Sequence, residues 1–346
     1  MRTATIDDVA KLAGVSIKTV SRVVNGEPNV RDSTRARVNV AIARLNYRPN
    51  LAARNLATKS SHLVALVYDD PSAYDIPSSS YVILLQQGVL KACRTAGFEL
   101  LIHPCRYGDS DIDEQLKALI EQARPDGIVL AAPLSNIEKV VDSISATETP
   151  FVRISPGKPN GGVFAVSTND REISAEMTRY LASLGHRKIA FLTGHPAHAA
   201  VTNRFLGYKD GLERSGIPYS EQWVMAGDNS IGSGEECARR LLRQEDPPTA
   251  IFAANDDMAA GVMRVAIRLG IDVPGQLSVA GCDDGALAQQ IYPSLTTIRQ
   301  PLDAMAERAA LALIRKSHGE DLSQGIEVIE ATLRIRESTG PAPSES

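Results

Sequence analysis

The sequence predicts an all-α helix-turn-helix head followed by an α/β core of two lobes, each built on a doubly wound parallel sheet. Residues 5–25, TIDDVAKLAGVSIKTVSRVVN, fit two short helices joined by a tight turn. From residue 61 onward, short apolar strands alternate with amphipathic helices, a pattern typical of parallel sheets with helices on both faces. This alternation occurs twice and ends in late crossovers, which predicts a hinged cleft between two lobes.

The first helix of the head is expected over residues 6–13. Its apolar face is supplied by Val9, Ala10, Leu12 and Ala13. Thr5 can cap the helix, and Asp8 stands three residues later, as in a capping box. Gly14 then occupies the sharp turn.

The second helix is expected over residues 17–25, with Ser16 as its cap and Val20, Val23 and Val24 facing inward. The outward face then carries Ile17, Lys18, Ser21, Arg22 and Asn25. Because this face belongs to a helix held by a turn, it is built to enter a DNA major groove. A third helix over residues 32–45 completes the head core with Val38, Ile42 and Leu45.

Charge is distributed unevenly along the chain. Residues 1–60 hold 11 basic and 4 acidic side chains, a net charge of +7, while the rest of the chain has 26 basic and 37 acidic side chains. A basic head on an acidic body indicates that only the head meets a polyanion. The candidates for phosphate contact in and after the third helix are Arg31, Arg35, Arg37, Arg44 and Arg48.

The bulk composition of the 346 residues is that of a globular protein, with no apolar run long enough to span a membrane and no leader-like start. Cys93, Cys105, Cys237 and Cys282 lack metal-ligand spacing, so we expect reduced core thiols in a cytoplasmic protein.

Ligands of open α/β sheets bind beyond the carboxyl ends of the strands. In this chain those ends are rich in hydrogen-bonding groups and suit a polar, hydroxyl-bearing small molecule. The expected strand ends are Tyr68-Asp69-Asp70, His103-Pro104, Ala131-Ala132-Pro133, Arg153-Ile154-Ser155, Thr193-Gly194-His195, Asn255-Asp256 and Cys282-Asp283-Asp284.

Two stretches, TIDDVAKLAGVSIKTVSRVVNGEPNV and LNYRPNLAARNLATKSS, closely resemble the LacI/GalR family of bacterial transcription regulators. The resemblance implies that Ile17, Lys18 and Arg22 read bases; Lys18 and Arg22 suit guanine, whereas Ile17 meets a thymine methyl or only packs against sugar. It implies phosphate or backbone contacts for Thr5, Ser16, Thr19, Ser21 and Asn25. It also implies a hinge helix within residues 49–60 that folds on DNA, including Asn50, the small Ala53, and Leu56 as a minor-groove wedge. Ordinary helix core is the alternative for Leu56.

The resemblance extends to the core through VTNRFLGY, FAANDDMA and VAGCDDG. It implies that Arg204, Asn255 and Asp283 bind an effector, with Asp69 and Ser155 as pocket positions of the first lobe. Capping of the following segments is the alternative for Asn255 and Asp283. Tyr68, Arg153, His195 and Phe205 are further candidates. Some relatives carry a stacking aromatic where this chain has Asn229, which leaves that role to Tyr68, Tyr74 or Phe205; Arg153 with Arg204 raises the alternative of an acidic sugar.

Other patterns that suggest chemistry are weak. His195 and His198 in GHPAH have no third metal ligand nearby, and Cys282-Asp283-Asp284 lacks a histidine partner. SIGSGEE lacks the ending of a phosphate loop. We therefore expect no metal, no cofactor and no enzymatic activity.

Together these features predict a dimeric transcriptional repressor that binds a pseudo-palindromic operator in double-stranded DNA. A small carbohydrate-type effector between the core lobes would change operator affinity, and the regulated genes would serve sugar uptake or catabolism. The alternatives are a sugar-binding protein of a transport system and a regulator that needs a co-repressor. The expected location is the cytoplasm, at the nucleoid when DNA is bound, without membrane contact.

The predicted organisation is a head over residues 1–48, a hinge over 49–60, a core over 61–340 and a flexible tail over 341–346. Within the core, the first lobe is expected at about 61–165 and 298–326, and the second at about 166–297 and 327–340.

Overall fold

The computed structural model describes residues 4–24, 29–47, 60–69, 80–158 and 162–344. The chain divides into two compact units, residues 1–61 and residues 62–346. The predicted hinge over residues 49–60 lies almost wholly outside the described residues. The two units are described separately below.

The head consists of three helices, α1 (Ile6–Ala13), α2 (Ile17–Val24) and α3 (Asp32–Leu45). The capping box at the start of α1 is present: the Thr5 hydroxyl accepts from the Asp8 backbone N–H, and the Asp8 carboxylate accepts from the Thr5 backbone N–H at 2.9 Å. Gly14 ends α1 with φ of 63°, and the Ser16 hydroxyl accepts from the backbone N–H of Thr19. The local signals of the sequence therefore placed these helices correctly.

The head core is small and formed by all three helices. Its buried members are Val9, Ala10, Ala13, Val20, Val23, Val38 and Ala41, and Ile42 and Leu45 pack against them. The prediction for Leu12 was wrong, because its side chain is 44% exposed. On an eight-residue helix the buried stripe is only wide enough for Val9, Ala10 and Ala13.

The first lobe of the core is built on a six-stranded sheet in the order β11-β5-β4-β3-β1-β2. All of its strand pairs are parallel. Its elements are β1 (Leu63–Asp69), α5 (Ser80–Ala96), β2 (Glu99–Cys105), α6 (Ile112–Ala123), β3 (Gly127–Leu130), η1 (Leu134–Asn136), α7 (Glu138–Ser145), β4 (Phe151–Ile154), β5 (Ala165–Thr168), α13 (Leu302–Ser317) and β11 (Ile326–Ile329).

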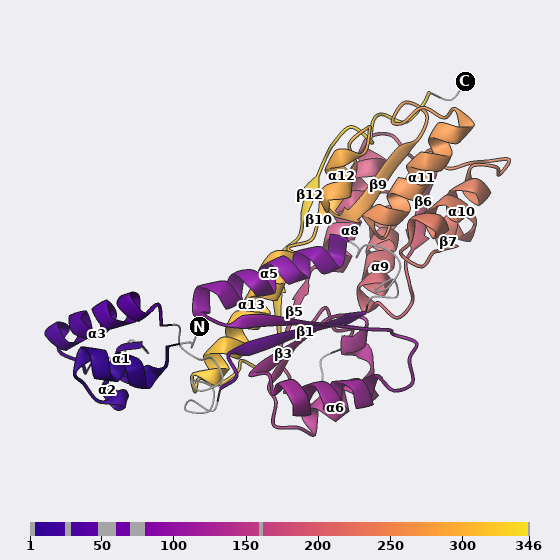
Figure 1. Cartoon of the computed structure of the whole chain (residues 1–346). Coiled ribbons are helices and arrows are strands. Elements are labelled where there is room, and N and C mark those ends of the chain that lie inside the picture. The colour runs from indigo at the N-terminus through magenta and orange to yellow at the C-terminus, as the bar shows by residue number, and fades with distance from the viewer. Residues whose placement is uncertain (1–3, 25–28, 48–59, 70–79, 159–161, 345–346) are drawn as a thin grey trace. The chain divides into compact units, whose positions relative to one another are not determined.

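The side chains of alternate residues in β1 and β3 point to opposite faces of this sheet. Val64, Leu66 and Val129 pack with α5 and α13 on one face. Ala65, Val67 and Ile128 pack with α6 and α7 on the other face. Figure 1 shows α5 and α13 side by side over the sheet, with α6 on the opposite side.

The second lobe repeats the plan with the order β12-β10-β9-β8-β6-β7. Only β12 runs antiparallel to its neighbour β10, which departs from the predicted fully parallel sheet. Its elements are α8 (Asp170–Ser183), β6 (Ile189–Thr193), α9 (Ala199–Arg214), η2 (Glu221–Trp223), β7 (Val224–Ala226), α10 (Ile231–Leu241), β8 (Ala250–Ala253), α11 (Asp256–Leu269), β9 (Ser278–Asp283), α12 (Ala286–Gln290), β10 (Thr296–Arg299) and β12 (Thr332–Arg334).

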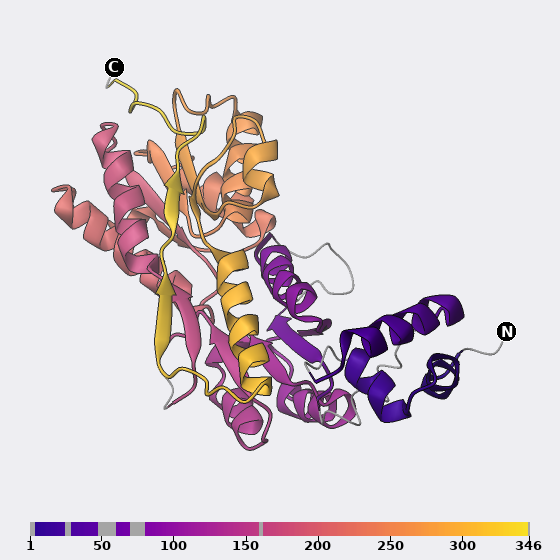
Figure 2. The ribbon, with the colours of Figure 1, turned by 90° about the vertical axis from the view of Figure 1, so that its left-hand side faces the viewer.

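The chain passes between the two sheets three times: after β5, after β10 and between β11 and β12. Figure 2 shows the last two strands, in yellow, following each other along one side of the core. Residues 165–168 were predicted to open the second lobe, but β5 pairs with β4 and β11 in the first sheet. The predicted division at residue 326 was also early, because β11 runs to Ile329 in the first sheet. A strand and the helix that follows it need not lie in the same lobe, and the sequence does not reveal this.

Two of these crossovers are tied together by Asn169. Its side-chain oxygen accepts from the backbone N–H of Ala331 at 2.8 Å and from the Thr168 hydroxyl at 3.2 Å. The segment between β5 and α8 is thereby joined to the segment between β11 and β12.

Helix α8 packs closely on α9 because Gly207 has no side chain. A Cβ atom at this position would lie 2.1 Å from the backbone oxygen of Arg171 and 2.8 Å from the Cβ of Ser174. We expect Gly207→Ala to lower the free energy of unfolding by about 1–3 kcal/mol, since the helices must move apart. Urea unfolding would measure this, with Gly232→Ala as a control, because the nearest atom to a Cβ at that helical glycine is 3.8 Å away. Equal stability of the two variants would contradict the prediction.

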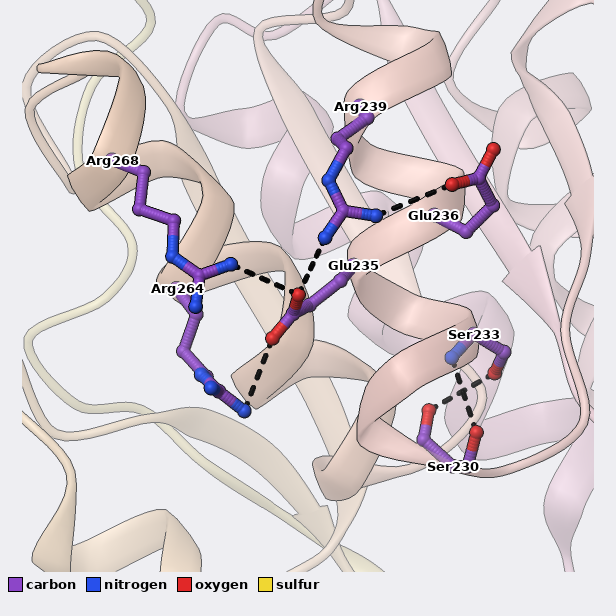
Figure 3. A network of polar contacts seen from close by, with 7 residues as sticks. All are labelled: Ser230, Ser233, Glu235, Glu236, Arg239, Arg264 and Arg268. Atoms are coloured by element: carbon purple, nitrogen blue, oxygen red, sulfur yellow. Dashed lines mark hydrogen bonds and ion pairs between the residues drawn. The ribbon is translucent and has the colours of Figure 1, made fainter.

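A carboxylate surrounded by arginines joins α10 to α11 (Figure 3). Glu235 is buried and accepts from Arg239 at 2.6 Å, Arg264 at 3.0 Å and Arg268 at 3.1 Å. Arg239 also reaches Glu236 of its own helix. Because three guanidiniums share one buried carboxylate, this pair of helices is held by a network rather than by one surface ion pair.

Among the described residues, no helix is both long and apolar enough to cross a membrane. Helix α9 begins at Ala199, five residues before Arg204. Arg204 therefore lies inside the helix, where its side chain has a fixed direction relative to the sheet.

Candidate functional site

The exposed start of α2 is the candidate DNA-binding surface. Ile17 is 48% exposed, and Lys18 beside it is also exposed. Ser21 and Arg22, one turn later, are half-buried. Val20 and Val23 face the head core, so the polar face of this helix points away from the core as predicted.

The predicted backbone-contact residues of the head have clear local roles. Thr5 and Ser16 cap their helices, and the Ser16 hydroxyl also lies 2.9 Å from the hydroxyl of Thr19. Arg31, Arg37 and Arg44 are exposed along α3. Asn25, Arg48, Asn50, Ala53 and Leu56, and Tyr74 of the core, lie outside the described residues.

The core holds a cavity of about 850 Å³ lined by both lobes. In each sheet the first five strands follow the order 2-1-3-4-5, so the chain reverses direction between β1 and β3 and between β6 and β8. Ligands bind at such switch points, beyond the carboxyl ends of the strands. Residues at the end of β1 or just after β3, β6 and β8 line the cavity: Asp69, Ala132, His195 and Asn255.

Six of the predicted effector residues line this cleft: Asp69, Ser155, His195, Arg204, Asn255 and Asp283. Ser155, Asn229 and Asp283, all in the lining, have positive φ values of 48°, 74° and 128°. Such backbone conformations are uncommon outside glycine and cluster at binding sites.

Three lower-ranked candidates lie outside the cavity lining. Tyr68 is 4% exposed and packs in the core beneath the first sheet, since neighbours on a strand face opposite ways and Asp69 takes the cleft side. Arg153 donates to the backbone oxygen of Ser135 at 2.6 and 2.9 Å and to that of Lys158 at 3.1 Å. Phe205 packs with Phe191 and Tyr208, because it turns away from Arg204 around α9. The structure therefore does not bring these three side chains into the cavity lining.

Arg204 is held by a buried ion pair. Its Nε donates to Asp170 at 2.8 Å, and its Nη1 donates to the backbone oxygen of Ala254 at 2.6 Å. Burial raises the pKa of Asp170, and the guanidinium acts in the opposite direction. Two nitrogen atoms of the Arg204 guanidinium are therefore already hydrogen-bonded, and these bonds fix the direction in which the side chain enters the cleft.

Asn255 both caps a helix and lines the cleft. Its side-chain oxygen accepts from the backbone N–H of Met258 at the start of α11, and its amide nitrogen donates to the backbone oxygen of Asn229 at 2.9 Å. The Asn229 side chain in turn accepts from the backbone N–H of His195 at 3.3 Å. Asn255 thus caps α11, as the alternative prediction had it, and also lies in the cleft.

Asp283 ends β9 and accepts a hydrogen bond from the amide of Gln300. Burial raises the pKa of Asp283 well above its ordinary value, while Arg204 acts to lower it. Gln300 lies in the crossover after β10 and lines the cleft. A ligand group that reaches Asp283 would therefore also act on a segment that joins the lobes.

Asp256 lies behind the cleft and makes stability depend on pH. Burial raises its pKa to about 7, although hydrogen bonds from Thr297 and Gly285 oppose the shift. The folded state thus favours the protonated form, and this stabilisation is present at low pH and lost as the pH rises through 7.

We expect the destabilisation caused by Asp256→Asn to be larger at pH 5 than at pH 8, by about 2 kcal/mol. Only the wild type carries this titrating group, so the pH dependence of the difference reports on Asp256 together with its effect on the neighbouring Asp283. Urea unfolding of both proteins at the two pH values would measure it. A difference that stays constant, or grows with pH, would contradict the prediction.

The described residues include no group of three or more histidine, cysteine or acidic side chains placed to hold a metal ion. The four cysteines are free and buried, as predicted for core thiols. Burial raises the pKa of Cys282 well above its ordinary value, which disfavours the reactive thiolate.

Two protein-family models match the chain: "Bacterial regulatory proteins, lacI family" at residues 5–50 and "Periplasmic binding protein-like domain" at residues 178–339. The chain is 32% identical to the HTH-type transcriptional regulator DegA of Bacillus subtilis (strain 168) over 339 residues, which cover 97% of this chain and 98% of that protein. The chain belongs to the LacI family of bacterial regulatory proteins.

Solved structures agree with this assignment over nearly the whole length. The LacI-family chain shares 26% identity and a TM-score of 0.81 with a lac repressor dimer bound to operator and the anti-inducer ONPF, covering 98% of this chain and 100% of that one. It shares 30% identity and a TM-score of 0.74 with the transcriptional regulator CelR in complex with cellobiose, covering 97% and 99%. The resemblance noted in the sequence is confirmed, and the protein is a helix-turn-helix transcriptional regulator of this family.

Two aromatic side chains of the cleft, Tyr81 and Tyr107, were missed in this LacI-family sequence. Tyr81 and Tyr107 of the first lobe and His198 of the second line the cavity with His195. Tyr107 follows β2 by two residues, so the rule of strand ends would have found it if β2 had been extended to Cys105. Tyr81 lies at the start of α5, which follows residues outside the described part of the chain, and no local pattern distinguished it.

Proposed function

We propose that this protein is a dimeric transcriptional repressor whose operator affinity is changed by a carbohydrate-type effector bound between the core lobes. The observation that carries the proposal is the presence in one chain of a capped helix-turn-helix with exposed Ile17 and Lys18 and a polar cleft at two topological switch points. The CelR structure in complex with cellobiose and the lac repressor dimer on its operator support the analogy.

On DNA, each head would place α2 in the major groove of one half-site of a pseudo-palindromic operator. Ile17, Lys18 and Arg22 would meet base edges, and Thr5, Ser16, Thr19, Ser21 and Asn25 would fix the helix on the backbone. We also propose, from the family motif, that Asn50, Ala53 and Leu56 belong to a hinge that binds the minor groove. This activity would place the protein in the cytoplasm, at the nucleoid when bound.

In the core, Asp69, Ser155, Arg204, Asn255 and Asp283 would hold the effector, with His195 beside them. The hydrogen bond between Gln300 and Asp283, and that between Ala331 and Asn169, connect the cleft to the segments that cross between the lobes. An effector that prefers one arrangement of the lobes shifts operator affinity by its difference in affinity for the two arrangements. The protein would act by binding alone, without catalysis, metal or cofactor.

Fluorescence anisotropy on DNA from upstream of its own and neighbouring genes tests this function. We expect tight binding that weakens steeply with salt, since phosphate contacts release counterions, and that one sugar abolishes. Binding that a ligand strengthens would instead identify a co-repressed regulator. Sugar binding without specific DNA binding would favour a transport-type solute receptor and contradict the proposal.

A further inference from the structure

The balance of charge in the cleft is the first indication of which sugars it accepts. Four acidic side chains line the cavity, Asp69, Asp228, Asp257 and Asp283, against the two guanidiniums of Arg106 and Arg204. Burial raises the pKa of Asp257 and of Asp283, so these two are not counted as full negative charges. Arg204 is already paired with Asp170, and burial lowers the pKa of His198 to about 4, so that this ring is uncharged near neutral pH. An anionic ligand would therefore meet Arg106, an exposed side chain at the cleft, as the one guanidinium in the described lining without an ion-pair partner.

Four helices begin at the cleft, and two of them, α10 and α11, carry carboxylates at their N-termini, whereas α5 and α9 have no acidic side chain in their first turns. A helix N-terminus attracts anions, but Asp228 stands before α10 and accepts from the backbone N–H of Ser230 at 2.9 Å. At α11, Asp256 and Asp257 occupy the first turn behind the cap Asn255. At α10 and α11, the N-terminal positions that would otherwise favour a sugar phosphate or a uronate are thus already served by the protein.

A row of rings crosses from one lobe to the other. Tyr107 meets His195 edge-on at 5.5 Å between ring centroids, His195 meets His198 at 6.2 Å, and His198 meets Tyr81 at 6.3 Å. The tyrosines come from the first lobe and the histidines from the second. Rings of this kind offer apolar surface to the C–H faces of a sugar while nearby polar groups bind its hydroxyls.

Two buried polar atoms of the lining are not fully satisfied: the side-chain oxygen of Gln300 lacks a hydrogen-bond partner, and the Tyr81 hydroxyl has at most a contact with the backbone of Ala132. Leaving such atoms unsatisfied is unfavourable. Both would be satisfied by hydroxyl groups, which donate and accept.

The cavity is also larger than a single sugar ring requires. Its volume of about 850 Å³ lies in the upper part of the range of about 300–1,000 Å³ that holds drug-sized ligands. One pyranose ring would leave much of it to water. From size, charge and ring placement together, we infer that the effector is an uncharged glycoside of at least two sugar rings, and that sugar acids and sugar phosphates are rejected. This inference rests on the proposed function.

Isothermal titration calorimetry of the full-length protein tests the inference. The panel pairs neutral disaccharides (cellobiose, gentiobiose, maltose, lactose, melibiose, trehalose) with glucose, galactose, glucuronate, galacturonate and glucose 6-phosphate. We expect a neutral disaccharide to bind at least tenfold more tightly than any neutral monosaccharide and at least a hundredfold more tightly than any anionic sugar. Tighter binding of an acid, a phosphate or a monosaccharide, or failure of every disaccharide, would overturn it.

Two variants connect the result to the cleft. Tyr81→Phe should weaken the preferred disaccharide about fivefold to tenfold, as expected for one lost hydrogen bond. Asp228→Asn combined with Asp257→Asn should narrow the preference for neutral over acidic sugars. Unchanged affinity and unchanged preference in these variants would show that the sugar binds elsewhere. DNA binding is measured separately by anisotropy, so a failure of the regulator function is distinguishable from a failure of the sugar preference.

Discussion

Replacing Arg204 with methionine is expected to lower the free energy of unfolding of the second lobe by about 3–5 kcal/mol, because Asp170 would remain buried without its cation. Both side chains are under 10% exposed, and the Nε–Oδ1 distance is 2.8 Å. The substitution also removes the donor to the backbone oxygen of Ala254. Urea unfolding followed by the fluorescence of Trp223, the one tryptophan of the chain, would report on this lobe.

The chain offers a matched control between the same two helices. Arg171 of α8 pairs with Asp210 of α9 at 2.6 Å, but the Arg171 side chain is 57% exposed. Arg171→Met should therefore cost less than about 1 kcal/mol. The double variant Arg204→Met with Asp170→Leu should recover part of the loss, since no uncompensated charge remains. If Arg204→Met costs no more than Arg171→Met, the buried pair does not stabilise the lobe as argued.

Replacing Asp283 with asparagine is expected to leave operator binding nearly unchanged while ligand-driven release requires at least tenfold more ligand. An acidic side chain that binds two hydroxyls contributes about 0.5–1.5 kcal/mol for each hydrogen bond when it is neutral, and about 1.5–3 kcal/mol for each one when it is charged. Asparagine keeps the size of the side chain, and the Gln300 amide can turn its unpartnered oxygen toward the new amide. The substitution should therefore lower the affinity for the ligand rather than the stability of the fold.

Anisotropy with a fixed operator and a titrated sugar measures operator binding and the ligand concentration needed for release in one experiment. Asp210→Asn is the control, because that carboxylate lies in the same lobe and pairs only with the exposed Arg171. We expect the control to respond to ligand as the wild type does. Release of the Asp283→Asn protein at the wild-type ligand concentration would remove Asp283 from the effector site.

Features specified by neighbouring residues were predictable from the sequence. Thr5 with Asp8, Gly14 and Ser16 act within one helical turn of where they stand, so α1 and α2 were placed to the residue at their starts. The alternation of strands and helices likewise indicated two wound sheets, because burial on both faces makes each strand apolar along its length. The strand-end rule then located Asp69, Ser155, Asn255 and Asp283 at the cleft.

Features decided by long-range contact were not predictable from the sequence. Arg153 ends a strand as Ser155 does, yet its guanidinium turns to the Ser135 backbone, 18 residues away, and leaves the cleft. The ring row formed by Tyr81, Tyr107, His195 and His198 exists because two lobes meet, and the pairing of β5 with the first sheet depends on strands from distant parts of the chain. The sequence by itself determined the family, the head and the edges where a ligand site must lie, because caps, turns and hydrophobic periodicity act locally. Only the tertiary structure decided which side chains face that site and what charge it presents, because those depend on how segments far apart in the chain pack against each other.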